Sequence, residues 1–166
     1  MWPTGCHERN VHINFNDFCG IIVCGKIRVY GRNVMNPVFI EILNKEFISQ
    51  HTIEVVNEIE FIVFSANSFD FGDVDIFEEK LGQYIVTLGR FTHTHFNISD
   101  IVNDENIQQI AIEITNFLMR VFENDIVCYG SHKGCGGYVD LKEMDKFDEK
   151  TLEEEKELFV WSGKYK

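Results

Sequence analysis

Alternation of apolar and polar residues predicts strands in the first two thirds of the chain. Residues 20–31 (GIIVCGKIRVYG) are rich in β-branched side chains, are bounded by glycines and alternate charged with apolar positions in KIRVY. Such a stretch is typical of a strand. Residues 37–43 (PVFIEIL) predict a second strand. Its Pro37 fits this interpretation, because proline is tolerated where a strand opens or lies on an edge.

Two longer stretches predict further strands. Residues 52–66 (TIEVVNEIEFIVFSA) place Glu54, Glu58 and Glu60 at one parity and mainly apolar residues at the other. This pattern is typical of a half-buried antiparallel strand with an acidic face, or of a bent hairpin arm. Residues 83–98 predict a fourth strand region, in which Gly89 marks a bulge.

The period then changes to that of a helix. Over residues 104–123 apolar side chains recur every three or four positions and polar residues fall on the other faces. The pattern predicts an amphipathic helix of about five turns that packs on a sheet, with Asp104 at its N-cap. The side chains expected to face the sheet are Ile107, Ile110, Ile114, Phe117, Leu118 and Val121.

Strand patterns return after this helix. They cover DIVCYG, GGYVDL and the closing LFVWSGKY, and between the last two DEKTLEEEKEL predicts a short charged helix with a capping box from Thr151 to Glu154. Strands grouped before and after one main helix predict an α+β fold. We expect a mostly antiparallel sheet, with the main amphipathic helix packed on it and the charged helix near the C-terminus. At 166 residues we expect a single domain, 1–166.

Charge and cysteine content narrow the class of partner and the compartment. The 27 acidic and 15 basic residues give a net charge of -12, which argues against nucleic acid or an anionic membrane as ligand. Such a charge favours a basic protein partner, or simply a soluble protein with a solvated acidic surface. The longest apolar run, GIIVCG, is too short to span a bilayer, and the start MWPTGCHERN lacks the pattern of a secretory signal. With five cysteines, an odd number, we expect reduced thiols in the cytoplasm.

The stretch CYGSHKGCGGYVD allows three interpretations. Cys128, His132 and Cys135 could ligate zinc, but no second pair at a familiar spacing supplies the fourth ligand. A nucleophilic Cys135 would need a base held within hydrogen-bond reach. A hairpin with SHKG as its turn needs only the glycines that follow, so we predict the hairpin. A small metal- or thiol-dependent enzyme that uses Cys128, His132 and Cys135 remains the alternative.

Two histidines form a second candidate for metal binding. His93 and His95 would point to the same face of a strand, as two ligands of a metal do, but no third ligand accompanies them. We therefore predict ordinary strand histidines, and we expect neither a metal nor a cofactor.

An acidic segment with interleaved aromatics, SFDFGDVDIFEEK, is the candidate partner-binding surface. Its five carboxylates lack the spacing of a calcium-binding loop. Carboxylates that steer a basic partner beside an aromatic anchor are typical of protein interfaces. The alternative is a solvated acidic loop whose aromatics anchor it to the core. The predicted contact residues are Asp70, Phe71, Asp73, Asp75, Phe77, Glu78 and Glu79.

Motifs of the common enzyme classes are missing from the sequence. It has no G-x-S-x-G elbow, no G-x-x-x-x-G-K-[ST] loop and no G-x-G-x-x-G fingerprint, so we predict a protein that is not an enzyme. In size, acidity and α+β layout the chain resembles bacterial immunity proteins. The resemblance implies a small cytoplasmic inhibitor that binds and neutralises a basic toxin domain such as a nuclease. A further alternative is a nucleic-acid mimic that occupies the DNA groove of a host or phage protein.

Overall fold

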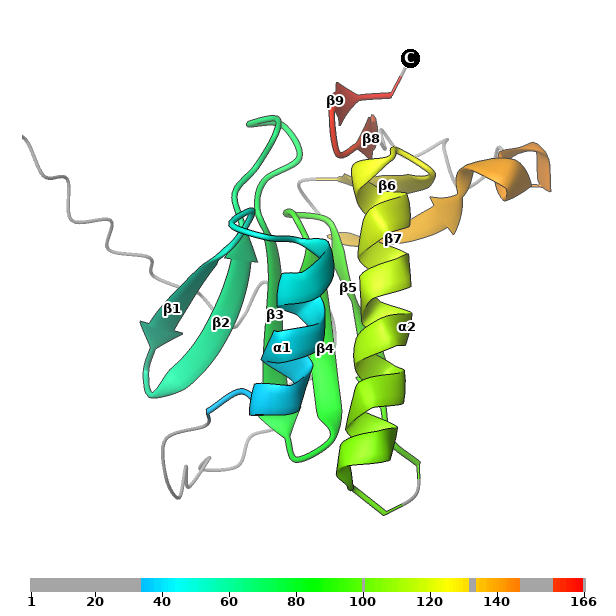
Figure 1. The fold of residues 1–166 in the computed structure, drawn as a ribbon. Coiled ribbons are helices and arrows are strands. Elements are labelled where there is room, and N and C mark those ends of the chain that lie inside the picture. Colours follow the sequence, from blue (N-terminus) through cyan, green and yellow to red (C-terminus); the bar gives the residue numbers. More distant parts are fainter. Residues whose placement is uncertain (1–33, 100, 132–133, 147–156, 166) are drawn as a thin grey trace, which may run out of the picture.

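The computed structural model describes residues 34–99, 101–131, 134–146 and 157–165. Two helices cover one face of a five-stranded antiparallel sheet, and a four-stranded sheet lies beyond the C-terminal end of the longer helix (Figure 1). The predicted α+β fold with antiparallel pairing is confirmed. The predicted strand at residues 20–31 lies outside the described residues. So does most of the predicted charged helix, whose last two residues, Glu157 and Leu158, belong to a strand.

The larger sheet is a meander in which every strand pairs antiparallel with the next one in the chain. Asn57 and Glu58 join the first two strands with φ values of 51° and 69°, the left-handed conformation that tight hairpin turns require. This turn places Glu54 opposite Phe61 and Glu60 opposite Val55, so the two glutamates lie on opposite faces of the sheet. The single acidic face predicted for residues 52–66 is therefore wrong. The strands are β1 (Thr52–Val56), β2 (Ile59–Phe64), β3 (Val74–Lys80), β4 (Gln83–Leu88) and β5 (Thr92–Asn97).

Gly89 ends β4 rather than bulging within one long strand. The region predicted as a single strand over residues 83–98 is a hairpin, with β4 and β5 paired from Gln83↔Asn97 to Leu88↔Thr92. Gly89 has φ 56°, and a Cβ atom there would lie 1.9 Å from the carbonyl oxygen of Phe71. Only glycine fits this close approach between the β2–β3 and β4–β5 connections.

Residues 37–43 form a helix, not the predicted strand. Helix α1 (Pro37–Glu46) begins after Asn36, whose side chain accepts a hydrogen bond from the Val38 N–H at 2.9 Å. Proline at the first helical position is favoured because its missing N–H would have no helical partner there. Phe39 and Leu43, four positions apart, are fully buried against the sheet. The Asn-Pro pair was thus a helix start signal, which the strand prediction overlooked.

Helix α2 (Asp104–Phe122) confirms the main predicted helix. Its N-cap is Asn103 rather than Asp104, since the Asn103 side chain accepts from the Asn106 N–H at 2.9 Å. Asp104 lies in the first turn, where a negative charge favours the helix dipole. Phe117, expected among the sheet-facing residues, is only half-buried. The buried residues of α2 are Ile107, Ile110, Ala111, Ile114, Thr115, Leu118 and Val121.

The smaller sheet confirms the predicted hairpin and joins it to the C-terminal strands in the order β7-β6-β8-β9. Close packing requires its glycines: a Cβ atom on Gly136 would lie 2.3 Å from the Phe91 carbonyl oxygen. The predicted turn residues His132 and Lys133 lie outside the described residues. The elements are β6 (Ile126–Ser131), β7 (Gly134–Asp140), the 3-10 helix η2 (Leu141–Lys146), β8 (Glu157–Val160) and β9 (Gly163–Lys164).

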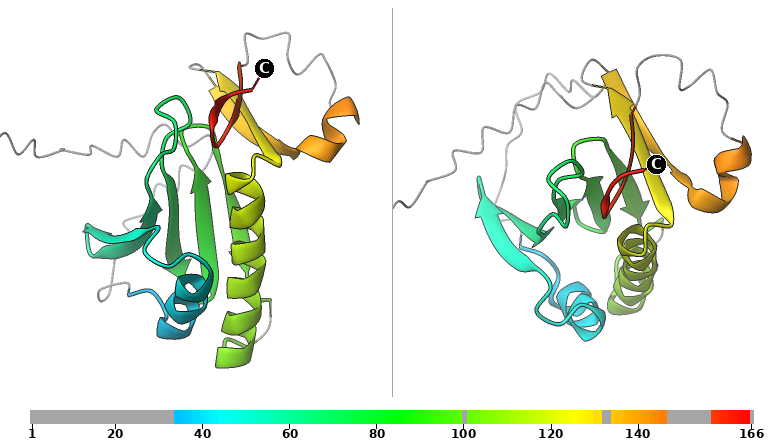
Figure 2. Two further views of the ribbon diagram at one scale, coloured as in Figure 1. Left: turned by 45° about the horizontal axis from the view of Figure 1, so that its top comes forward. Right: turned by 90° about the horizontal axis from the view of Figure 1, so that it is seen from above.

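Aromatic side chains connect the two sheets and the helices. Phe71 of the β2–β3 connection contacts both Phe91 and Trp161, at ring-centroid distances of 5.8 and 5.6 Å. Trp161 in turn contacts Phe122 at the end of α2, and Phe91 stacks on Phe159 of β8. The smaller sheet is therefore held across the end of the larger one (Figure 2). Neither α1 nor α2 is long and apolar enough to cross a membrane.

Candidate partner-binding site

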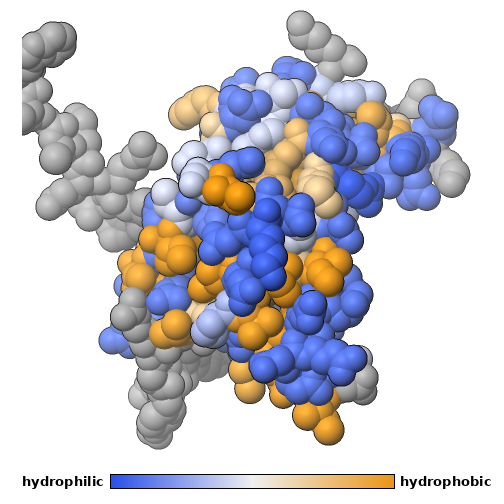
Figure 3. Space-filling view, in the orientation of Figure 1, coloured by the Kyte–Doolittle hydropathy of each residue, from blue (hydrophilic) through white to orange (hydrophobic). Residues whose placement is uncertain are grey.

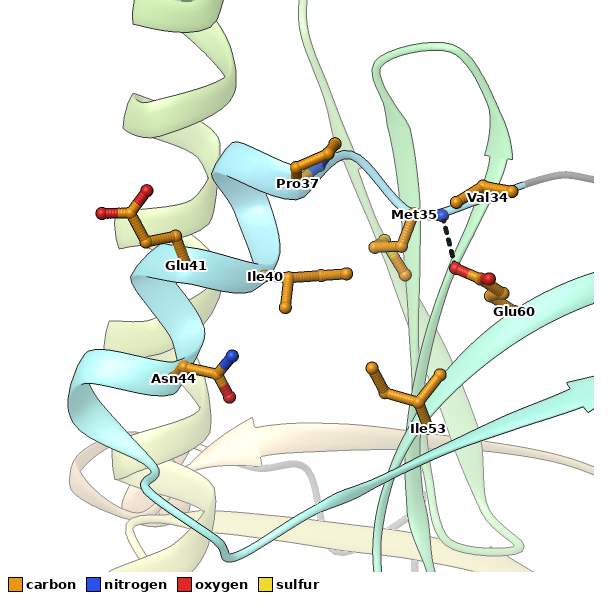
Figure 4. Close-up of a pocket in the computed structure, with 8 residues that line it drawn as sticks. All are labelled: Val34, Met35, Pro37, Ile40, Glu41, Asn44, Ile53 and Glu60. Atoms are coloured by element: carbon orange, nitrogen blue, oxygen red, sulfur yellow. Dashed lines mark hydrogen bonds between the residues drawn. The ribbon is translucent and has the colours of Figure 1, made fainter.

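An open groove of about 520 Å³ lies between α1 and the β1–β2 hairpin. Ile40 of α1 and Ile53 of β1 point toward one another across it, and Asn44 lies at its rim (Figure 4). The full set of lining residues is Val34, Met35, Pro37, Ile40, Glu41, Asn44, Ile53 and Glu60. The walls are mainly apolar, which is typical of sites that bind an apolar side chain of a partner.

Strand β1 leaves two apolar side chains half exposed beside the groove. Ile53 and Val55 retain 51% and 50% of their accessible surface. Ile53 pairs with Ile62, which is fully buried beneath the helices, so Ile53 and Val55 face the helical side of the sheet. In the space-filling view, apolar residues lie at the surface over the hairpin and beside α1 (Figure 3). The hairpin thus extends past the cover that the helices provide.

The residues that lead into α1 form one end of the groove and are held there by hydrogen bonds. The Met35 N–H donates a hydrogen bond to the Glu60 carboxylate at 3.0 Å, and the Met35 side chain is buried. The Asn36 cap then sets the first turn of α1. These contacts fix the distance between the helix and β2, so the groove is a preformed feature of the fold.

Negative charge predominates in the segment that forms the groove. Residues 34–64 contain five glutamates and one lysine, Lys45. Lys45 pairs with Glu41 one turn away on the exposed side of α1, at 3.0 Å. Such an exposed pair contributes little to stability. Both side chains lie at the surface, where a partner can reach them. Glu54 and Glu58, on β1 and in the hairpin turn, are exposed.

The sequence did not reveal this site because no single stretch contains it. The groove forms only when Ile40 lies on a helix and Ile53 on a strand, and residues 37–43 were predicted to be a strand. The start signal at Asn36 and Pro37 could have identified the helix. The exposed apolar edge could not be predicted, because alternation alone does not say how far a helix covers a sheet.

The acidic segment predicted as the partner-binding surface is divided among three environments. Phe71 is fully buried and Glu78 is 6% exposed, so these two side chains are not available at the surface. The Glu78 carboxylate accepts a hydrogen bond from the Gly82 N–H at 2.7 Å and stabilises the β3–β4 turn. Asp70 and Asp73 are exposed in the β2–β3 connection, where Asp73 accepts from the Ala66 N–H.

The rest of that segment lies on the sheet face opposite the helices. Asp75 and Phe77 are half-buried there, and Glu79 is exposed. The Phe77 ring contacts the Phe61 ring at 5.0 Å. The most exposed aromatic of the region is Phe69, at 85%, which the prediction did not include; the Arg90 guanidinium lies over its ring.

Burial shifts the ionisation of two carboxyl groups in this segment. It raises the pKa of Asp75 to about 6, although a hydrogen bond from the Thr87 hydroxyl at 3.2 Å works in the opposite direction. Burial also raises the pKa of Glu78. Asp75 and Glu78 are therefore poor candidates for steering a basic partner, because both are partly or wholly withdrawn from solvent.

The two candidate metal-binding histidines do lie together. His93 and His95 share the sheet face with Asp75, and their ring centroids are 4.9 Å apart. Burial and the neighbouring His95 lower the pKa of His93. Within the part of the chain that the structure describes, no group of three His, Cys, Asp or Glu side chains is placed to hold a metal ion.

Cys128, the first residue of the alternative enzyme site, lies in the core. Its side chain is fully buried on β6, and burial raises the pKa of the thiol to about 12. A thiol needs a lowered pKa and access to substrate to act as a nucleophile. The side chains of His132 and Cys135 fall outside the described residues.

No family model, curated protein or solved structure matches the chain.

Proposed function

We propose that this protein is an acidic binding protein that neutralises a basic protein partner, in the manner of a bacterial immunity protein that inhibits a toxin domain such as a nuclease. The observation that carries the proposal is the apolar groove between α1 and β1, set in a region with five glutamates and one lysine. The groove offers a place for a buried anchor, and the surrounding carboxylates offer charge complementarity.

The two parts of this surface have different roles in binding. Exposed charges at the rim of an interface act mainly on the association rate, because they attract the partner before contact. A net charge of -12 extends that attraction over the whole molecule. Apolar contacts at the centre act mainly on the dissociation rate, because a well-packed anchor must be withdrawn before the partner leaves.

The test begins with the protein encoded directly upstream of this gene, where a toxin gene paired with an immunity gene would lie. Binding kinetics of the purified pair are measured at two salt concentrations, together with inhibition of the toxin activity. We expect rapid association that slows as salt rises. If the upstream product is not basic, or does not bind, the proposal is wrong.

Two charge variants locate the binding face. Replacing Glu54 and Glu58 by Gln removes two exposed charges from the β1–β2 hairpin that forms one wall of the groove, and we expect it to slow association several-fold at low salt. The matched variant replaces Asp70 and Asp73 by Asn, which removes the same charge from the exposed part of the acidic segment. Slower association in the second variant alone would place the partner on that segment instead of the groove.

A further inference from the structure

Within the part of the chain that the structure describes, the outer edge of β1 has no pairing strand. This edge indicates how the groove recognises a partner, an inference that rests on the proposed function and deepens it. Among the described residues β1 pairs with β2 alone, whereas the other end of the sheet is covered: β5 approaches β7, and the Tyr138 hydroxyl donates to the Thr94 hydroxyl at 3.2 Å. Natural proteins protect edge strands with proline, lysine or a covering loop. β1 contains neither proline nor lysine and exposes Ile53 and Val55.

We propose that an extended, basic segment of the partner protein adds to the sheet as a strand beside β1. Its backbone would pair with the outer edge of β1, and alternate side chains would point to opposite faces of the sheet. On the helical side they would meet Ile53 and Val55 and reach the groove toward Ile40. On the other side they would meet Glu54. The segment that fits therefore alternates apolar residues with lysine or arginine.

A second copy of the same chain is a poorer occupant. Glu54 is the central residue of β1, so a two-fold antiparallel pairing of two β1 strands over their full length would place Glu54 opposite Glu54 of the second copy. Like charges directly opposite each other on paired strands are destabilising. Both copies would also bring the same excess of glutamate to the contact.

One alternative, a strand from before α1 that pairs parallel to β1, is disfavoured by the handedness of its connection. With the helices toward the viewer, β1 lies at the left end of the sheet and runs downward, while α1 runs upward from its start at Pro37 (Figure 1). A strand that preceded α1 and paired parallel to β1 on its free side would make a left-handed crossover. Such crossovers are right-handed in about 98% of cases.

The probe is a capped ten-residue peptide of alternating lysine and valine, with peptides of alternating glutamate and valine and of alternating lysine and serine as comparisons. The protein is the full chain. We expect only the lysine–valine peptide to bind and to slow hydrogen exchange of the β1 amides. An Ile53→Lys substitution should weaken binding at least about tenfold, because it places a charge in the apolar contact. The control Ile101→Lys alters an isoleucine before α2 that is exposed even more, at 79% against 51% for Ile53, and should change affinity less than about twofold.

The outcomes separate this inference from the proposed function. If the upstream basic protein binds but Ile53→Lys leaves its affinity unchanged, strand addition at β1 is wrong and the function stands. Peptide binding without protection of the β1 amides also overturns the proposal of strand addition. So does protection of the whole β1 edge in the protein alone at low concentration, because the chain would then cover its own edge. Protection that rises with protein concentration would show a second copy on the edge and overturn it equally.

Discussion

The ring of Phe39 on α1 stacks on the ring of Tyr84 on β4, with centroids 4.5 Å apart and planes inclined by 9°. Both side chains are fully buried. This contact fixes α1 over β4, the fourth strand of the sheet, and so helps to determine how far β1 extends beyond the helix. The width of the groove thus depends on a core contact that a partner would not touch.

We expect Phe39→Ala to lower the free energy of unfolding by about 3 to 5 kcal/mol, since it removes a buried ring and leaves a cavity. Denaturant unfolding at constant pH measures the effect. Ile48→Ala is the control: Ile48 follows α1 but is 71% exposed, and its loss should cost less than about 0.5 kcal/mol. Equal stability of the two variants would show that α1 is not held by this stacking.

Two isoleucines on α2 test which face of the helix meets the sheet. Ile114→Asp would bury a charge without a partner and should destabilise the protein by about 4 kcal/mol or more. Ile112→Asp makes the same chemical change two positions away, at a residue that is 39% exposed, and should cost less than about 1 kcal/mol. Thermal melting of the pair gives the comparison. A similar loss in both variants would contradict the assigned face.

Gly89 is expected to tolerate no side chain. An alanine there would place Cβ 1.9 Å from a backbone oxygen of Phe71, so one of the two connections must move. Gly72→Ala is the matched control, because Gly72 also has a positive φ but its nearest contact would be 3.4 Å away. We expect Gly72→Ala to cost about 1 to 3 kcal/mol, from backbone strain, and Gly89→Ala to cost more. The reverse order, measured by denaturant unfolding, would contradict this.

Asp75 makes stability depend on pH. Burial raises its folded-state pKa from 3.8 to about 6, so between these values the folded protein keeps a proton that the unfolded chain has lost. The contribution of this carboxyl to the free energy of unfolding therefore falls as pH rises through that window and levels off above it. Asp75→Asn should remove this slope and stabilise the protein at pH 7.5 by about 1 to 3 kcal/mol.

The exposed Asp70 supplies the control for that measurement. Asp70→Asn removes the same charge from the β2–β3 connection and should leave the dependence of stability on pH between 4 and 6 unchanged. Unfolding curves at three pH values for the parent and both variants are sufficient. If Asp70→Asn alters the slope as much as Asp75→Asn does, long-range repulsion rather than burial is responsible.

The main helix and the hairpin at CYGSHKGCGGYVD were predicted correctly from the sequence. The helix ending at Phe122 was predictable because its apolar period holds over 19 residues, and the β6–β7 hairpin because a short glycine-rich stretch follows one strand pattern and leads into the next. The short apolar run after Pro37 fits a helix and a strand equally well. There the preceding asparagine decides, by capping the first turn.

Side-chain direction in irregular segments was less predictable. Phe69 and Phe71 stand two residues apart among aspartates, yet one is 85% exposed and the other fully buried. Their difference arises from the β2–β3 connection, in which Phe71 packs against Phe91 and Trp161 from distant parts of the chain. Local pattern contains no information about those partners, so the predicted contact set mixed exposed and interior residues.

The strand order also sets a sequence of assembly. Each pairing in the larger sheet joins neighbours along the chain, so the sheet can form through successive short loop closures. β8 instead returns to β6, with Cys128 beside Phe159, and this contact must close a much longer loop. Because the entropy of loop closure is lost before the contact forms, nonlocal pairings form slowly. We expect β1 to β5 to become structured early in refolding and the C-terminal strands to dock last, when the aromatic contacts of Trp161 are completed.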